Sequence, residues 1–448
     1  MSNGAKRMPS ADPVQGLHQR WSDALAGMDD SAGPEWLRQL RLQAAGAFRE
    51  GGLPHRKVEA WKYTPMRRFD AYGLAPPDDA AATHSGFDMP APLCDRAVMV
   101  DVRDGVLQAL PSELPRALSI LTLEQGIVRF EPRLRALFEA IDLQGASRAF
   151  AALNTALARQ GLIIHVDAGC DAGRLLLRWA FSPGAAAFMN HFRIFVLLEQ
   201  GARLDLVEQF LSPRGGEGPA AAGLNVVIQA ELEENAALSH TRVQAESDAA
   251  VLLTSTRSRL AAGSCYVYRG FDLGASLARH ELNVRLEGAA ASTDLAGAWV
   301  LDGDRHADTH ACVEHVAPDC SSEQYFRGVL GGRSRGVFNG RALIQPGADG
   351  SSVRQSNANL LLSPQAEMDT KPELEIYADE VEASHGATVG QLDDTAVFYL
   401  RSRGLSEAAA RRMLTAAHCR AVTDRLTGRG LAERVAELVD AAMPEGDS

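Results

Sequence analysis

The segment Glu281-Leu282-Asn283-Val284-Arg285-Leu286-Glu287 decides the fold class of this chain. Leu282, Val284 and Leu286 alternate with charged and amide side chains, which is the two-residue period of a β-strand with one buried face. Similar short apolar runs, separated by turn residues, recur about every ten residues through the middle of the chain. The other runs are Leu162–Val166, Arg174–Trp179, His191–Leu198, Leu224–Val243, Val251–Leu260, Tyr266–Leu273, Ala298–Leu301, Tyr325–Leu330 and Gly336–Gln345.

A block of strands without intervening helices fits a β-sandwich, a β-barrel or a β-solenoid. This block covers about two hundred residues, which is large for a sandwich. The core of a solenoid, in contrast, grows with every stacked turn. We therefore favour a solenoid, although the sequence has no regular hexapeptide or nonapeptide repeat.

The sequence before the β block has mostly helical patterns. A helix is predicted from Pro34 to Gly51-Gly52, because proline suits a first turn and glycine ends helices. Two more are predicted at Arg129–Asp142 and Ser147–Arg159, and Ala97–Val102 is strand-like. Residues 1–12 are predicted to be disordered. Tyr72–Ser85, rich in proline, alanine and aspartate, is predicted to be a linker.

The sequence after the β block is also helical. Asp393 or Asp394 can cap a helix that ends at Gly404, and Ser406 can cap a second helix from Glu407 to about Leu426. A third is expected from about Leu431 to Met443. These helices could cap the end of the β core or offer a docking face. We thus expect a mostly helical N-terminal domain (residues 1–160), a β core (161–390) and a C-terminal helical domain (391–448).

Composition narrows the classes of function. The 448 residues carry 57 acidic and 45 basic side chains, a formal net charge of -12, which argues against binding nucleic acid or anionic membranes. No apolar run approaches the ~20 residues that cross a bilayer, and no apolar core follows Lys6 and Arg7 as in a secretory signal. The six cysteines form no CxxC pair, so a disulfide framework is not expected. We expect a cytoplasmic protein.

The densest group of potential metal ligands lies between His306 and His315. If this segment is a strand, His306, Asp308, His310 and Cys312 share one face and His315 lies on the other. A transition metal would accept these donors. Residues two apart on a strand are separated by nearly 7 Å, so three donors converge only if the strand bends. A polar, solvated sheet face is therefore favoured over a dedicated metal site.

The segment Lys371–Gly390 joins the β block to the C-terminal helices. Its first half alternates, with Leu374 and Ile376 on one side and acidic residues on the other. The strand is expected to stop at Ser384-His385-Gly386-Ala387, which puts His385 at a strand-to-helix junction. A single histidine near a strand end is more often structural than functional. The small neighbours of His385, however, leave its ring accessible for chemistry.

Several segments together resemble the SufB/SufD family, the scaffold subunits of the SUF iron–sulfur cluster assembly machine. In the C-terminal part the matching segments are Lys371–Asp379, Ser384–Gly390 and Phe398–Gly404. Elsewhere they are Glu59–Thr64, Ala152–Ala156, Tyr325–Leu330 and Gly336–Gly340. The form Ser-His-Gly-Ala-Thr-Val-Gly is similar to that of the SufD branch.

The resemblance implies a right-handed parallel β-helix core flanked by N-terminal and C-terminal α-helical domains. It also implies a SufBCD complex, in which the β-helix pairs with SufB and the ATPase SufC docks on residues 391–448. In isolation the chain could form a homodimer. His385 would face a SufB cysteine and act as a ligand of iron or of a transient iron–sulfur cluster at that interface. No cofactor is expected on the isolated chain.

One departure from the family concerns this site. Many relatives have a cysteine two residues before the histidine, where this chain has Ala383. Imidazole alone is a weak basis for holding a cluster, so SufB would supply the other ligands.

We therefore expect a non-catalytic scaffold subunit for iron–sulfur cluster assembly. The alternative is a stand-alone β-solenoid metalloenzyme that uses His306, His310, Cys312 or His315. A third interpretation is a purely structural stabiliser of SufB, in which His385 has no chemical role.

Overall fold

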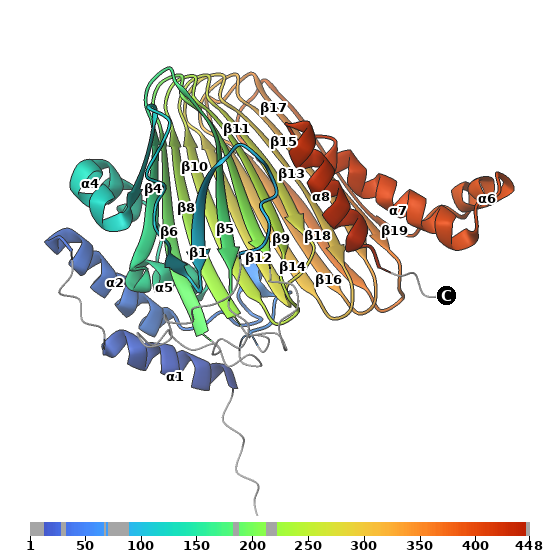
Figure 1. Cartoon of the computed structure of the whole chain (residues 1–448), viewed down its shortest axis with the longest axis horizontal. Helices are drawn as coiled ribbons and strands as arrows, with labels where there is room; N and C mark the ends of the chain where they lie inside the picture. The colour runs from blue at the N-terminus through green and yellow to red at the C-terminus, as the bar shows by residue number, and fades with distance from the viewer. Residues whose placement is uncertain are drawn as a thin grey trace, which may run out of the picture.

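The computed structural model describes residues 13–27, 33–66, 69, 89–181, 188–211 and 222–444. Its centre is a solenoid of stacked strands, with helices at the N-terminal end and along one side (Figure 1). The predicted solenoid, with helices at both ends of the chain, is confirmed. Residues 1–12 and Tyr72–Ser85, predicted to be disordered and a linker, lie outside the described residues.

Two sheets form the solenoid, and successive strands alternate between them, so that each turn adds one strand to each sheet. Neighbouring strands are parallel except for the pairs β1–β2 and β3–β4. The ten-stranded sheet, here sheet I, contains β1 (Val98–Arg103), β2 (Val106–Leu107), β5 (Asp171–Ala180), β7 (Arg203–Leu211), β9 (Ala237–Ala245), β11 (Cys265–Asp272), β13 (Ser292–Leu301), β15 (Ser321–Leu330), β17 (Ser351–Leu361) and β19 (Val381–Gly390). The nine-stranded sheet, here sheet II, contains β3 (Leu118–Thr122), β4 (Gln160–Val166), β6 (Phe188–Leu198), β8 (Ala222–Leu232), β10 (Val251–Leu260), β12 (Leu277–Leu286), β14 (His306–His315), β16 (Arg335–Ile344) and β18 (Glu367–Ile376).

The hydrophobic core fills the space between the two sheets. Leu282, Val284 and Leu286 of β12 point into it and are at most 2% exposed, as their alternation predicts. Aromatic rings from both sheets also meet there: Phe326 of β15 lies 4.7 Å from Phe338 of β16, measured between ring centroids. Such close interior packing joins each turn to the next.

The N-terminal helices pack on the outer face of sheet II. They are α1 (Pro13–Ala26), α2 (Glu35–Gly51), α4 (Leu123–Glu139) and α5 (Ala149–Leu157). Trp21, Phe48 and Trp61 from this part of the chain pack against Leu253 of β10 and Leu277 of β12. The same part also supplies β1 and β3, which extend the two sheets. Within the described ranges, no helix is long and apolar enough to span a bilayer.

The C-terminal helices are α6 (Asp394–Ser402), α7 (Glu407–Thr423) and α8 (Arg429–Ala441). The Asp393 and Ser406 side chains accept hydrogen bonds from the first turns of α6 and α7, so the predicted caps are confirmed. Cys419 and Val435 pack with Val329 of β15 on the outer face of sheet I. α7 and α8 therefore lie along the side of the solenoid and do not cap its end, while α6 extends away from the body (Figure 1).

The position of His385 differs from the sequence prediction. The strand containing Leu374 and Ile376 is β18, and a short turn connects it to β19. Ser384-His385-Gly386-Ala387 lies in the middle of β19 and not at a strand end. Pairing of β19 with β17 along its whole length explains this difference, because main-chain hydrogen bonds extend the strand through small residues that carry no apolar pattern.

Candidate functional site at the open end of the solenoid

The last turn of the solenoid, formed by β18 and β19, leaves the core open to solvent. In the described part of the chain, no strand pairs with the outer edge of β18 or of β19. Ile376 and Val389, which point toward the core side, are 41% and 44% exposed. An uncovered edge of this kind presents free main-chain N–H and C=O groups and is a template for pairing with another chain.

His385 lies on this open turn and faces the interior side of sheet I. In the register between β17 and β19, it is opposite Gln355, and Ala383 is opposite Val353. Val353 packs in a small apolar cluster inside the solenoid with Ile344. Because side chains two residues apart on a strand share a face, His385 and Ala383 both face the mouth of the interior. The imidazole is exposed.

The described residues contain no group of three or more histidine, cysteine, aspartate or glutamate side chains placed to hold a metal ion. At the mouth of the interior, Ala383 provides no donor where it faces the same side as His385. The arrangement therefore offers one imidazole to whatever covers the open end, and further ligands would have to come from the covering partner.

The residues of the alternative metal site are divided between two faces of β14. His315 points inward, is fully buried and hydrogen-bonds Ser351 and Ser322 with its two ring nitrogens. Burial lowers the pKa of His315 to about 4. His306 and His310 point outward, as the alternation predicted. A site using all of these residues is therefore not assembled.

The outward face of β14 is occupied by an ion-pair network. The Asp308 carboxylate is buried and accepts hydrogen bonds from Arg279 of β12 and from Thr64. His310 Nε2 lies 2.9 Å from Asp308 Oδ1. Burial alone would raise the pKa of Asp308, but Arg279 and His310 hold it well below its usual range. These contacts pair the Asp308 charge with cationic and hydroxyl groups and bury it, so this part of the outward face is polar but not solvated.

Cys312 shares this outward face but is a poor metal ligand in its present state. Burial raises the pKa of its thiol, against the opposing effect of Arg341 on the next strand. A thiol, unlike a thiolate, coordinates metal weakly.

The segment Glu59–Thr64 lies over this network and anchors the N-terminal region. Arg279 stacks on the Trp61 ring, with 4.0 Å between the guanidinium carbon and the ring centroid. Thr64 Oγ1 also lies 3.0 Å from His306 Nε2. The segment therefore has a structural role on the outer face of sheet II, where Glu59 also reaches the last turn and lies 3.3 Å from Lys371 Nζ of β18.

A second exposed surface is formed by the C-terminal helices. Phe398 and Tyr399 on α6 are 71% and 56% exposed, and Met413 on α7 is 55% exposed. Large apolar side chains gathered on a projecting helix mark a surface for protein contact.

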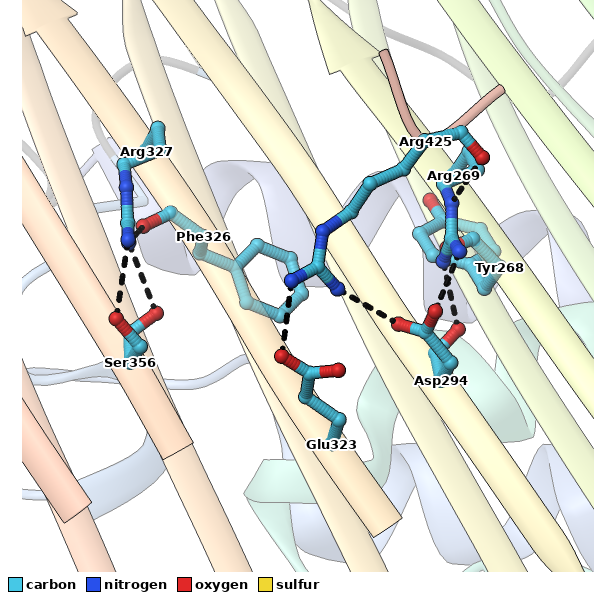
Figure 2. A network of polar contacts seen from close by, with 8 residues as sticks. All are labelled: Tyr268, Arg269, Asp294, Glu323, Phe326, Arg327, Ser356 and Arg425. Atoms are coloured by element: carbon cyan, nitrogen blue, oxygen red, sulfur yellow. Dashed lines mark hydrogen bonds and ion pairs between the residues drawn. The ribbon is translucent and has the colours of Figure 1, made fainter. Parts of the chain in front are cut away.

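Arg425, in the turn between α7 and α8, fixes these helices to sheet I (Figure 2). Its guanidinium donates to Glu323 of β15 at 2.9 Å and to Asp294 of β13 at 3.4 Å. The hydrogen bond from Arg425 lowers the pKa of Glu323. Arg269 of β11 binds Asp294 and donates to the Arg425 carbonyl oxygen (Figure 2). The sequence analysis did not single out Arg425, and no local pattern marked it.

Comparisons with known proteins agree with this architecture. A family model described as SUF system FeS cluster assembly, SufBD core domain, matches residues 181–418, and a model of the SufBD protein N-terminal region matches residues 22–176. The chain is 30% identical over 400 residues to the iron-sulfur cluster assembly protein SufD of Escherichia coli, covering 88% of this chain and 90% of that protein. It is 28% identical over 428 residues to an iron-sulfur cluster assembly SufBD family protein of Synechocystis, covering 93% and 92%. It is 25% identical over 436 residues to the chloroplastic protein ABCI7 of Arabidopsis thaliana, covering 95% and 90%.

Proposed function

This chain belongs to the SufBD family of the SUF iron–sulfur cluster assembly system, and we propose that it acts there as a non-catalytic scaffold subunit. In this proposal the open end of the solenoid pairs with SufB, and the C-terminal helices bind the ATPase SufC. The nascent cluster is the cargo of the complex and forms at the interface with SufB. The complex works in the cytoplasm.

The observation that carries the proposal is the position of His385 on the uncovered last turn. Its imidazole faces the mouth of the interior and is exposed, so a second solenoid placed end to end would bury it at the interface. The free edges of β18 and β19 supply main-chain groups for such pairing, and Ile376 and Val389 supply apolar area.

The chemistry of the donors supports a shared site. Iron–sulfur clusters are held mainly by cysteine thiolates, with histidine as an occasional ligand. Here Ala383 and His385 face the same mouth, so this chain contributes an imidazole and no thiolate at that point. The SufB subunit would contribute the thiolates.

Two features support the C-terminal helices as the ATPase contact. Phe398 and Tyr399 project from α6, which extends beyond the solenoid (Figure 1). Arg425 ties the turn after α7 to β13 and β15. A partner on α6 and α7 would therefore be connected, through strands of sheet I, to the sheet that carries His385.

Co-expression with SufB and SufC tests this function. We expect His385→Ala to form the complex but to lose most of the iron and sulfide bound by wild type. Ser384→Ala is the matched control, because Ser384 faces outward opposite Arg354 and should leave cluster formation unchanged. If His385→Ala builds clusters at the wild-type rate, the chain acts only as a structural stabiliser of SufB.

A further inference from the structure

Gln355 is a buried side chain with no hydrogen-bond partner. It is 5% exposed, and neither its Oε1 nor its Nε2 has a partner in the part of the chain that the structure describes. Leaving a buried amide unpaired costs about 1–3 kcal/mol for each group, so its persistence needs an explanation.

The position of Gln355 supplies that explanation. It lies on β17 directly opposite His385 of β19, and both side chains face the interior of the solenoid. The two side chains are not hydrogen-bonded in this structure, but neighbouring strands are about 4.8 Å apart, so a rotamer change of the exposed imidazole would bring it onto the amide. In the register of sheet I, Gln355 is aligned with Gln324 of β15, and Gln324 is aligned with Leu295 of β13. The two residues aligned behind His385, Gln355 and Gln324, are therefore both amides.

Gln324, whose Oε1 is also without a partner among the described residues, lies one turn further from His385 than Gln355 does. Its Nε2 donates to the main-chain oxygen of Arg341 at 3.1 Å, which holds it across the interior to sheet II. On the last strand of sheet II, Thr370 Oγ1 is also buried without a partner among the described residues. Buried polar atoms without a partner occur in many parts of the described chain, and those in the last two turns, which include Gln355 and Thr370, lie where they would meet an incoming partner or its bound group.

We propose that Gln355 is a positioning residue for His385. Its Oε1 accepts a hydrogen bond from one ring N–H of the imidazole, so that the second ring nitrogen keeps its lone pair directed out of the mouth. This inference rests on the proposed function, in which that nitrogen binds iron of the nascent cluster. Metal-binding histidines are commonly oriented in this way by an oxygen acceptor on the other ring nitrogen, which fixes the tautomer.

The tautomer of His385 is the direct readout. We would label the full-length chain with ¹⁵N-histidine and record imidazole nitrogen shifts at alkaline pH, with His385→Ala identifying the signals. We expect one neutral tautomer to predominate in wild type. Gln355→Leu should change the tautomer ratio about two- to tenfold, the equivalent of one hydrogen bond. Gln355→Glu keeps an acceptor oxygen and should restore the wild-type preference, which a merely structural role would not predict.

The same variants in the complex with SufB and SufC separate this inference from the proposed function. Gln355→Leu should slow cluster formation while the complex still assembles, and Gln355→Glu should recover it. An unchanged tautomer ratio in Gln355→Leu would overturn the contact between Gln355 and His385. A changed ratio with wild-type cluster formation would overturn its positioning role. If His385→Ala still forms clusters as wild type does, the proposed function itself is refuted.

Discussion

Thr64 Oγ1 donates a hydrogen bond of 2.5 Å to Asp308 Oδ2, which joins two residues that are 244 positions apart in the sequence. The same hydroxyl oxygen lies 3.0 Å from His306 Nε2 and can accept a hydrogen bond from the N–H at that position. One side chain of the N-terminal region therefore bridges two buried polar groups on β14. This contact explains how the segment Glu59–Thr64 closes over the outer face of sheet II.

Removing that hydroxyl should destabilise the protein. Thr64→Val keeps the shape of the side chain but leaves the Asp308 carboxylate without one donor, and a hydrogen bond to a buried charge contributes about 1.5–3 kcal/mol. Urea unfolding should show this loss of unfolding free energy. Thr64→Ser retains the hydroxyl and should recover most of it. Equal stability of Thr64→Val and wild type would show that the bond contributes nothing.

His315 should make stability depend on pH. Burial lowers its pKa to about 4 in the folded protein, compared with about 6.5 in an unfolded chain. Between these values the unfolded chain binds a proton that the folded protein does not, so this residue reduces stability as pH falls from about 6.5 to about 4. Below that range its contribution becomes constant.

His315→Gln removes the titratable imidazole while keeping groups that can hydrogen-bond Ser322 and Ser351. The difference in unfolding free energy between wild type and His315→Gln should therefore change, in favour of the variant, by about 1.4 kcal/mol per pH unit across that range. Urea titrations at several pH values measure it, with His55→Gln at an exposed position as control. A difference that stays constant with pH contradicts the prediction.

Arg425→Gln should loosen α7 and α8 from sheet I without unfolding the solenoid. It removes the ion pairs with Glu323 and Asp294 and the stacking on Tyr325, whose ring centroid is 4.0 Å from the guanidinium carbon. The Arg425 side chain is 27% exposed, so we expect only about 1 kcal/mol of local stability to be lost, or about fivefold faster amide hydrogen exchange in these helices.

Arg429→Gln is the matched control for Arg425→Gln. Arg429 also pairs with a glutamate, but its side chain is 92% exposed. We expect unchanged exchange in this variant. Equal exchange rates in both variants would show that the network in Figure 2 does not hold the helices.

The exposed aromatic residues of α6 should be needed for the ATPase contact. Phe398→Ser and Tyr399→Ser together remove the apolar surface of α6, and we expect binding of SufC to weaken at least about tenfold with unchanged thermal stability. Val128→Ser on α4, a position that is 82% exposed, should bind SufC like wild type. Binding of the double variant at wild-type affinity would place the contact elsewhere.

Much of the solenoid could be predicted from its apolar runs. Val251–Leu260 coincides with β10, and Leu282, Val284 and Leu286 point inward as expected. The repeat was not visible in the sequence because each turn contains two strands joined by connections of unequal length. The spacing in sequence between paired residues therefore differs from turn to turn, as it does between the pair Leu277 and His306 and the pair Arg335 and Glu367. A period that varies from turn to turn leaves no hexapeptide pattern.

Strands with polar interiors could not be recognised from apolar runs. β17 points Gln355, Asn357 and Asn359 inward, and β19 has Ser384-His385-Gly386 at its centre. These segments are strands because their main chains pair with the previous turn. The order of side chains in the sequence carries no signal of that pairing. His385 was therefore identified correctly as exposed but was placed wrongly at a strand end.

The candidate site followed partly from residues and partly from the family. The exposure of His385 could be inferred from its small neighbours, whereas its position at a subunit interface was implied only by the resemblance. The alignment of His385 with Gln355 could not be predicted, because their 30-residue separation has meaning only once the register of β17 and β19 is known. The alternation of the His306–His315 group was predicted correctly, but its outward face is a buried ion-pair network and not the solvated polar face that was expected.

In the proposed function the His385 imidazole binds the cluster formed between this chain and SufB. Pulsed electron paramagnetic resonance on the reduced cluster, in a complex whose histidines are ¹⁵N-labelled only in this chain, detects that bond through the nitrogen nucleus. We expect a strong ¹⁵N coupling in wild type that disappears in His385→Ala and persists in Ser384→Ala. A cluster without that coupling in wild type, or with the same coupling in His385→Ala, would contradict it.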